Sequence, residues 1–194
     1  MKKLNLAVVA VAAMLAMPLA PATAADGPHV APIKEYVTAN VLPWLSDPVV
    51  VNAIKAQNEK NASLGQADID KLDKQWRAEV DAGSKPMIDG VMGNELSKFL
   101  AQKKEASGGL ITEAFVMDDK GLNVGQSDVT SDYWQGDEAK WKETYAVGPD
   151  AIFVDEIEKD ESTQQLQSQV SVSIKDESGK AIGAITLGVN VDAL

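Results

Sequence analysis

The sequence predicts an α+β fold, in which a five-stranded antiparallel sheet carries long N-terminal helices packed on one face. Apolar side chains in residues 25–109 recur at steps of three and four, the spacing of amphipathic helices. Residues 110–194 are instead rich in strand-forming side chains. Turn-length connections join two pairs of these strands, and such short connections require antiparallel neighbours. Helices and strands in separate blocks indicate the α+β class.

The N-terminus has the layout of an export signal. Two lysines follow Met1, an apolar run covers residues 4–19, and Ala22-Thr23-Ala24 supplies the small residues that a signal peptidase reads. The run is shorter than the roughly 20 apolar residues of a membrane-spanning helix. We therefore expect residues 1–24 to be a signal peptide, with an uncleaved anchor as the alternative. Residues 25–194 are expected to form a single domain in the periplasm, with no membrane insertion after cleavage.

The composition excludes several classes of function. Without Lys2 and Lys3 the chain keeps 16 basic against 29 acidic residues, and this negative excess disfavours nucleic acid as a partner. The chain has no cysteine, which excludes thiolate chemistry. Its only histidine, His29, is expected in a terminal tail, so one chain cannot build a histidine-based triad or a multi-histidine metal site. Phosphate-binding, dinucleotide-binding and nucleophile-elbow motifs are missing as well. We expect neither enzyme activity nor a cofactor.

Helical spacing and stop signals divide the first half. The expected helices cover residues 33–45, 49–58 and 69–80, with a last one that runs from Pro86 to Ser107-Gly108-Gly109. Pro43 should kink or end the first helix. Asp47-Pro48 is typical of a helix start, with an N-cap followed by proline. In the second half, strands are expected at residues 110–117, 122–127, 151–157, 165–174 and 181–191.

A long connection, residues 128–150, joins the second and third expected strands. It holds Tyr133, Trp134, Trp141 and Tyr145, four of the ten aromatic residues in the chain. Residues 137–145 can form a short helix with Trp141 and Tyr145 one turn apart. Because long connections inside a compact domain tend to be functional, this segment is the first candidate for a site.

Three segments resemble the Cache family of extracytoplasmic sensor domains, which are PAS-like and of the PDC type. They are residues 115–124 (FVMDDKGLNV), residues 131–138 (SDYWQGDE) followed by Trp141, and residues 169–191. The resemblance covers about half of residues 25–194. It implies a ligand pocket between the sheet and the connection of residues 128–150. Because aromatic side chains can face a cation, we expect a small polar or cationic metabolite as the ligand. By the same resemblance the ligand-binding candidates are Asp132, Tyr133, Trp134, Trp141 and Tyr145.

Two departures from the family pattern shape the functional hypothesis. Family members usually sit between transmembrane helices of chemoreceptors or histidine kinases, whereas this sequence shows only the export signal. We therefore expect a stand-alone secreted form that passes its message to a membrane receptor or another periplasmic protein. The amino-acid-binding branch uses an arginine near the aromatics, and the one arginine here is Arg77. It is expected to pair with Asp73 or Asp81, with a carboxylate clamp as the alternative.

Two alternatives to a binding protein stay open. The aromatic residues of the connection can simply pack a helix on the sheet, which would make the chain a ligand-free interaction or scaffold protein of the same fold. Acidic groups could also hold calcium, although their spacing does not match an EF-hand loop. These groups are Asp118 with Asp119, Asp128 with Asp132, and the acidic run of residues 155–161. Whether any of them binds a divalent cation is left open.

Overall fold

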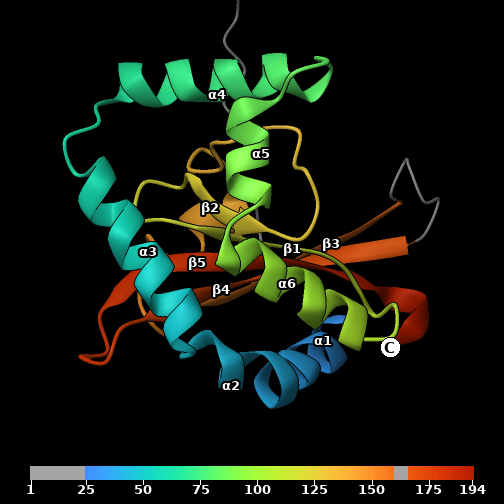
Figure 1. Ribbon diagram of the computed structural model, residues 1–194. Helices are drawn as coiled ribbons and strands as arrows, with labels where there is room; N and C mark the ends of the chain where they lie inside the picture. The colour runs from blue at the N-terminus through green and yellow to red at the C-terminus, as the bar shows by residue number, and fades with distance from the viewer. Residues whose placement is uncertain (1–24, 160–165) are drawn as a thin grey trace, which may run out of the picture.

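The computed structural model describes residues 25–159 and 166–194 and contains one five-stranded sheet (Figure 1). The strands are β1 (Ile111–Met117), β2 (Asn123–Gln126), β3 (Ile152–Lys159), β4 (Leu166–Lys175) and β5 (Ala181–Asn190). Their order is β2-β1-β5-β4-β3, and each pair of neighbours is antiparallel. The predicted α+β fold class is confirmed. The expected signal peptide lies outside the described residues.

Helices cover one face of the sheet. The helical elements are α1 (Val30–Tyr36), a π-helical turn (Val37–Val41), α2 (Leu42–Leu45), α3 (Pro48–Asn61), α4 (Gln66–Val80), α5 (Pro86–Met92), α6 (Glu95–Ala106), the short α7 (Ala139–Lys142) and a 3-10 turn (Val191–Ala193). Figure 1 shows α1, α2, α3 and α6 lying against the sheet. Their buried residues, among them Ile33, Ile54 and Leu100, form one core with β-strand residues such as Ile185 and Leu187.

The strand register explains why the two faces of the sheet differ. Val116, Ile185 and Val172 are direct partners across β1, β5 and β4, and all three belong to the core under the helices. Side chains alternate along a strand, so the neighbouring rows point to the other face. On that face Glu113 and Gln169 both pair with Gly188. Because Gly188 has no side chain, the Gln169 amide reaches across it and donates to the Glu113 carboxylate at 2.9 Å. The second face therefore carries polar groups on a rigid strand framework.

One expectation about the helices is narrowed and another needs correction. Of the two effects expected of Pro43, it does not end the first helix, which is interrupted by the π-helical turn and continues into α2. The wider turn accommodates a proline that has no N–H and would crowd the preceding carbonyl. The expected single helix from Pro86 is in fact two helices, α5 and α6, separated at Gly93 and Asn94. Asn94 is the N-cap of α6, and its side-chain oxygen accepts from the Ser97 N–H at 2.7 Å. The side-chain amide of Asn94 donates to the Val124 carbonyl at 2.8 Å. Because Asn94 caps α6, the chain cannot continue as one helix from α5.

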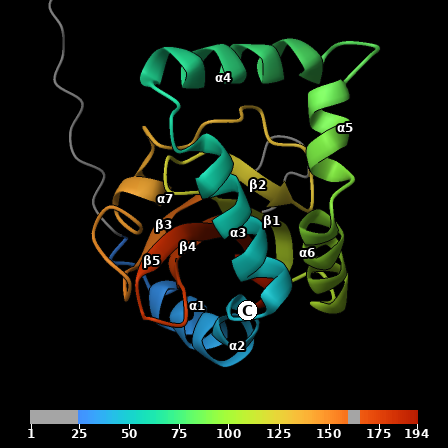
Figure 2. The same cartoon turned by 60° about the vertical axis from the view of Figure 1, so that its left-hand side comes forward.

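Helix α4 departs from the layer formed by the other helices. Figures 1 and 2 show it lying across the end of α5, away from the sheet. Its buried Trp76 stacks on Tyr133 of the long connection, with ring centroids 5.3 Å apart. The Trp76 indole N–H donates to the Thr130 carbonyl at 2.8 Å. Helix α4 is thus attached to the connection between β2 and β3, in addition to α5.

The chain near residue 25 covers an edge of the sheet. The Ala25 N–H donates to the Val154 carbonyl of β3 at 2.9 Å. The His29 ring nitrogen Nε2 lies 3.1 Å from the Asp155 carbonyl oxygen, and His29 is only 5% exposed. The expectation of a tail position for His29 is therefore wrong, because long-range contacts with the edge strand bury the ring.

Candidate functional site

The long connection is fastened to the turn between β1 and β2. The Gln135 N–H donates to the Gly121 carbonyl at 2.8 Å, and the Trp134 indole N–H donates to the Lys120 carbonyl at 2.8 Å. Gly121 has a φ of 80°, and a Cβ atom there would collide with the backbone of Gly136. Two glycines thus allow the turn and the connection to approach within backbone contact.

A buried carboxylate holds the same turn. Asp118 is fully buried, and its oxygen Oδ1 accepts from the N–H groups of Lys120 and Leu122, each at 2.9 Å. Its other oxygen accepts from the side-chain amides of Gln57 and Asn61 on α3, each at 3.0 Å. The Asp118 backbone carbonyl also accepts from the Trp141 indole at 3.2 Å. Asp118 therefore joins α3, the turn and the connection.

Helix α4 is held to the connection by Asp73, Arg77 and Asp132. Asp73 accepts from the N–H groups of Tyr133 and Trp134 at 2.9 and 3.1 Å. Arg77 donates to Asp73 at 2.7 Å, as predicted, and also to Asp132 at 3.1 Å. The Asp132 side chain is 13% exposed, and its second oxygen accepts from the Gln135 amide. Arg77 is therefore placed between two carboxylates of the chain itself.

Asp73 gives the fold a contribution that depends on pH. Burial opposes its ionisation, but hydrogen bonds from Arg77, Trp134 and Tyr133 outweigh burial and lower the pKa of Asp73. A lowered pKa stabilises the fold above the unfolded-state value of about 3.9, and this stability is lost as pH falls through the folded value. We expect Asp73→Asn to lower the free energy of unfolding at pH 7 and the gap to the parent protein to close below about pH 4. Urea unfolding at pH 7, 5, 4 and 3 measures the gap, with Asp70→Asn on the exposed side of α4 as the control for charge. A gap as large at pH 3 as at pH 7 would contradict the expectation.

The five ligand-binding candidates do not share one cavity. Tyr133 is buried against Trp76 and lines a hollow of about 610 Å³ between α3, α4 and α5, on the helix side. Burial raises the pKa of its phenol, as does the nearby Asp118. The rings of Trp141 and Tyr145 lie tilted to each other with centroids 5.2 Å apart, and they pack against buried Phe115 and Met117 on the other face.

Of the remaining candidates, Trp134 packs beside the Trp76 cluster, while Asp132 lines a groove on the open face of the sheet. The structure thus separates the predicted site residues into a helix-side group and a group on the open face.

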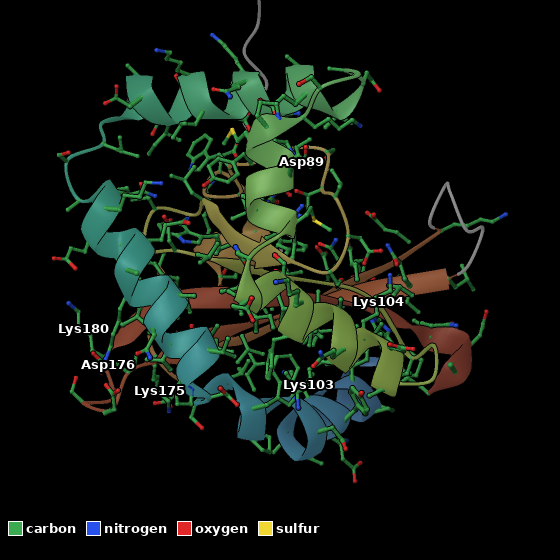
Figure 3. All side chains as sticks on the ribbon, viewed as in Figure 1. Asp89, Lys103, Lys104, Lys175, Asp176 and Lys180 are labelled. Carbon is green, nitrogen blue, oxygen red and sulfur yellow. The ribbon has the colours of Figure 1, made fainter. Side chains whose placement is uncertain are left out.

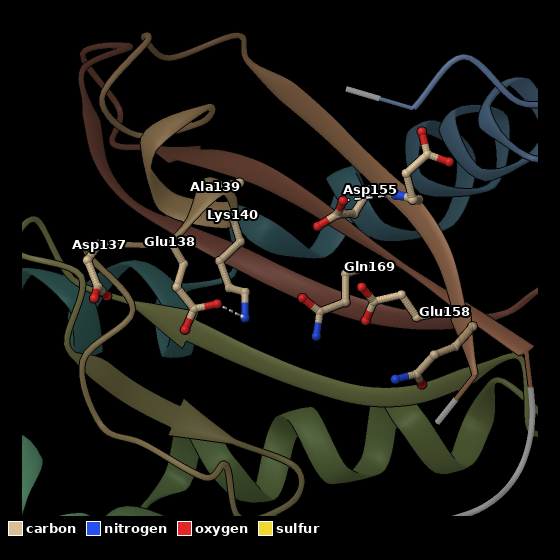
Figure 4. A pocket seen from close by; sticks show the side chains of 9 residues that line it. Asp137, Glu138, Ala139, Lys140, Asp155, Glu158 and Gln169 are labelled. Atoms are coloured by element: carbon tan, nitrogen blue, oxygen red, sulfur yellow. Dashed lines mark hydrogen bonds and ion pairs between the residues drawn. The ribbon is translucent and has the colours of Figure 1, made fainter. Parts of the chain in front are cut away.

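That groove lies between the connection and the strands β1, β3 and β4 (Figure 4). It consists of two adjoining pockets of about 390 and 230 Å³ that share Glu138, Lys140 and Gln169. The carboxylates that line it are Glu113, Asp132, Asp137, Glu138, Asp155, Glu156 and Glu158. Among its described lining residues Lys140 is the only basic one. The groove therefore has a strongly negative wall with a single positive group inside.

Polar groups of this groove were missed in the sequence, although one signal for them exists. Gln169, Ser171 and Ser173 alternate with the apolar residues Val170, Val172 and Ile174 of β4, and Gln167 lies on the same side of the strand as Gln169. Ser171 and Ser173 are buried, so this polar row does not simply face solvent. Two amides, Gln167 and Gln169, lie in the groove. Lys140 and Gln135 carry no such periodic signal, because they come from the irregular connection.

Two of the acidic residues considered for calcium, Asp118 and Asp128, have other partners. Asp118 is occupied by four hydrogen-bond donors, and Asp128 pairs with Lys104 at 2.6 Å. Within residues 25–159 and 166–194 no three acidic or histidine side chains come together in a way that could hold a metal ion. The end of the acidic run, residues 160–161, lies outside the described residues. Burial next to Asp118 raises the pKa of Asp119, so this carboxyl holds its proton more readily than usual.

Comparison with known proteins gives structural neighbours only. No family model matches the chain, and no curated protein matches it. The sensor domain of the V. cholerae histidine kinase DctB is similar at 14% identity and a TM-score of 0.48, over 84% of this chain and 51% of that one. The sensory domain of the Campylobacter jejuni chemoreceptor Tlp3 with isoleucine bound is similar at 13% identity and a TM-score of 0.38, over 86% and 64% of the two chains.

A third neighbour is the ligand-binding domain of the Pseudomonas fluorescens chemoreceptor CtaA in complex with L-alanine. It is similar at 12% identity and a TM-score of 0.38, over 85% of this chain and 60% of that one. These neighbours are Cache-type sensor domains, the class that the sequence resemblance names. The chain spans between half and two thirds of the length of these structures. At such values the likeness concerns the fold alone.

No helix in the described part of the chain is both long enough and apolar enough to cross a lipid bilayer.

Proposed function

We propose that this chain is a periplasmic small-molecule-binding sensor domain of the Cache type, and that its ligand lies in the acidic groove on the open face of the sheet. The groove itself is the observation that carries this proposal. Its floor comes from strand residues such as Glu113 and Gln169, which are fixed to each other by a hydrogen bond. Its wall comes from Asp132, Glu138 and Lys140 of the connection. Rigid polar groups around an open cavity are what a small-molecule site requires.

The charge of the groove favours a small polar or cationic metabolite. Seven carboxylates surround one lysine, and a concave surface lined by one sign of charge concentrates ions of the other sign. No chemical step is needed to explain this arrangement, and we assign the groove a binding role rather than a catalytic one. Of the predicted ligand-binding residues, Asp132 belongs to this site. For Tyr133, Trp134, Trp141 and Tyr145 we propose an indirect role, through the position of the connection.

The groove also offers a route to a partner protein. Asp132 lines the groove and accepts from Arg77 of α4. Helix α4 rests on residues 130–134 through the Trp76 stack and the Asp73 hydrogen bonds. We propose that a ligand which shifts the connection also shifts α4, and that a membrane receptor or another periplasmic protein reads the change there.

The ligand-free scaffold remains the alternative, and one observation favours it. The indole N–H groups of Trp134 and Trp141 are both hydrogen-bonded to backbone carbonyls, and both rings are packed. Aromatic residues that fill the structure in this way need no ligand.

A thermal-shift screen tests the proposed function. Amines, amino acids, organic acids, nucleobases and divalent cations are added to the purified protein. A ligand of the folded state at 100 times its dissociation constant adds about 2.7 kcal/mol, which raises Tm by several degrees. We expect the shift to shrink in Glu138→Gln and to persist in Asp89→Asn, whose carboxylate is exposed on α5 (Figure 3).

Two outcomes would contradict this assignment. A shift that persists in Glu138→Gln but disappears in Tyr133→Phe would place the ligand in the helix-side hollow. The absence of any shift across the panel would favour the scaffold.

A further inference from the structure

Lys140 lies in the groove in the way a bound organic cation would. Its ammonium group is 2.7 Å from a Glu138 carboxylate oxygen and donates to the Gln135 side-chain carbonyl at 3.2 Å. The same nitrogen lies 5.5 Å from the centre of the Phe115 ring, a residue of the sheet that is almost fully buried. The Lys140 side chain is 14% exposed, and Figure 4 shows its end turned toward Glu138 inside the pocket.

These three neighbours are a complete recognition set for an ammonium group. A carboxylate supplies the opposite charge, an amide carbonyl accepts an N–H, and the face of an aromatic ring attracts a cation. All three would contact the ammonium of a free ligand in the same way. The cavity that continues past Lys140 toward Asp155 and Glu158 is lined by further carboxylates. A ligand that enters this groove therefore meets negative charge along its whole length, apart from Lys140 itself.

We propose that the groove binds small organic ammonium compounds, and that Lys140, held between Glu138, Gln135 and Phe115, occupies the cation position until such a ligand displaces it. This inference rests on the proposed function and deepens it by naming the ligand class. Lysine suits the role because its ammonium is carried on a flexible four-carbon stem, and α7 is a helix of only four residues. The side chain can leave the position without unfolding the sheet.

Displacement of Lys140 would also reach α4. Gln135 accepts from Lys140 and donates through its amide to Asp132, which in turn accepts from Arg77. When a ligand ammonium replaces that of Lys140, the side-chain oxygen of Gln135 accepts its hydrogen bond from a different direction. The hydrogen bonds of Asp132, which joins the connection to Arg77 of α4, thus depend on which cation occupies the groove.

The variant Lys140→Met tests the proposal, because it removes the competing charge and keeps an apolar stem. The probes are n-butylammonium and tetramethylammonium, with butyrate as the anion of matched size, each titrated calorimetrically into the full protein. We expect the ammonium probes to bind Lys140→Met about tenfold more tightly than the parent protein, since no internal ion pair must be broken. Adding Glu138→Gln to Lys140→Met should remove this gain. Lys142→Met, on the same short helix, should leave the parent affinity unchanged.

The opposite results overturn the inference. If Lys140→Met binds the ammonium probes no more tightly than the parent does, Lys140 is not a competitor. If butyrate binds the parent and is lost in Lys140→Met, Lys140 is instead an anion clamp, and the proposed binding function stands without this inference. Lys140→Gln is the second variant for the case in which methionine perturbs folding. Its circular dichroism spectrum and Tm show whether the comparison is made between folded proteins.

Discussion

Asp118→Ala is expected to lower the free energy of unfolding by about 3 kcal/mol, because hydrogen bonds to a charged group contribute about 1.5–3 kcal/mol each and part of the loss is recovered locally. The variant deprives the amides of Gln57 and Asn61 of their shared acceptor. It also frees two N–H groups of the β1–β2 turn. Chemical unfolding followed by circular dichroism measures the effect.

The chain contains a matched control for this variant. Asp176 opens the β4–β5 turn in the same way, with its carboxylate accepting from the N–H groups of Ser178 and Lys180. The glycines three residues after the two aspartates have φ values of 80° and 83°. Asp176 lies on the surface and, in these contacts, serves only its own turn (Figure 3). Asp176→Ala should therefore cost clearly less than Asp118→Ala. Equal losses would mean that the contacts of Asp118 with α3 contribute nothing.

Trp76→Ala is expected to destabilise the protein by about 3–5 kcal/mol, the usual range for removing a large buried aromatic side chain. The ring is fully buried, stacks on Tyr133 and bonds to the Thr130 carbonyl. Its loss also removes one of the attachments of α4 to the connection, leaving those of Asp73 and Arg77. Hydrogen exchange should therefore show α4 opening before the sheet in this variant.

Two other variants separate burial from aromatic character. Trp76→Phe keeps a ring against Tyr133 and should recover part of the loss. Trp44→Ala removes a half-buried indole that meets Phe99 edge-on at 5.6 Å, and it should cost less than Trp76→Ala. A loss below about 1 kcal/mol in Trp76→Ala would show that the α4 cluster is not part of the cooperative core.

Local patterns predicted the kind and order of the main elements. The alternation of side chains in β4 is determined by residues close together in the sequence, and so is each of the turns that begin at Asp118 and Asp176. The structure contains the strand and both turns. Patterns of that range did not reveal the break between α5 and α6, because the Asn94 side chain is held partly by Val124, thirty residues away. The burial of His29 depends in the same way on Asp155, at a separation of 126 residues.

The site was less accessible to sequence reasoning than the fold. The concentration of aromatic residues made the connection the first candidate for a site, and one predicted residue, Asp132, lines the groove that we propose as the site. The contact between Glu113 and Gln169 over Gly188 depends on strand register, which no local pattern specifies. Lys140 becomes notable only when the Phe115 ring of strand β1 lies beside its ammonium group. Sequence thus located the connection, and the partners of its side chains required the folded sheet.

The contacts at the two edges of the sheet affect the tendency of the protein to aggregate at high concentration. An uncovered strand edge is a template on which a second chain can add its own strand, and proteins that avoid such growth cover the edge or charge it. Ala25 and His29 occupy carbonyls of β3 at its start, and Asp155, Glu156 and Glu158 give the rest of that strand negative charge. At the opposite margin, β2 is only four residues long and its Asn123 N–H is taken by the Tyr133 carbonyl. The same connection that forms the groove therefore also covers part of the β2 edge, and an edge covered in this way is less open to the addition of a strand from a second chain.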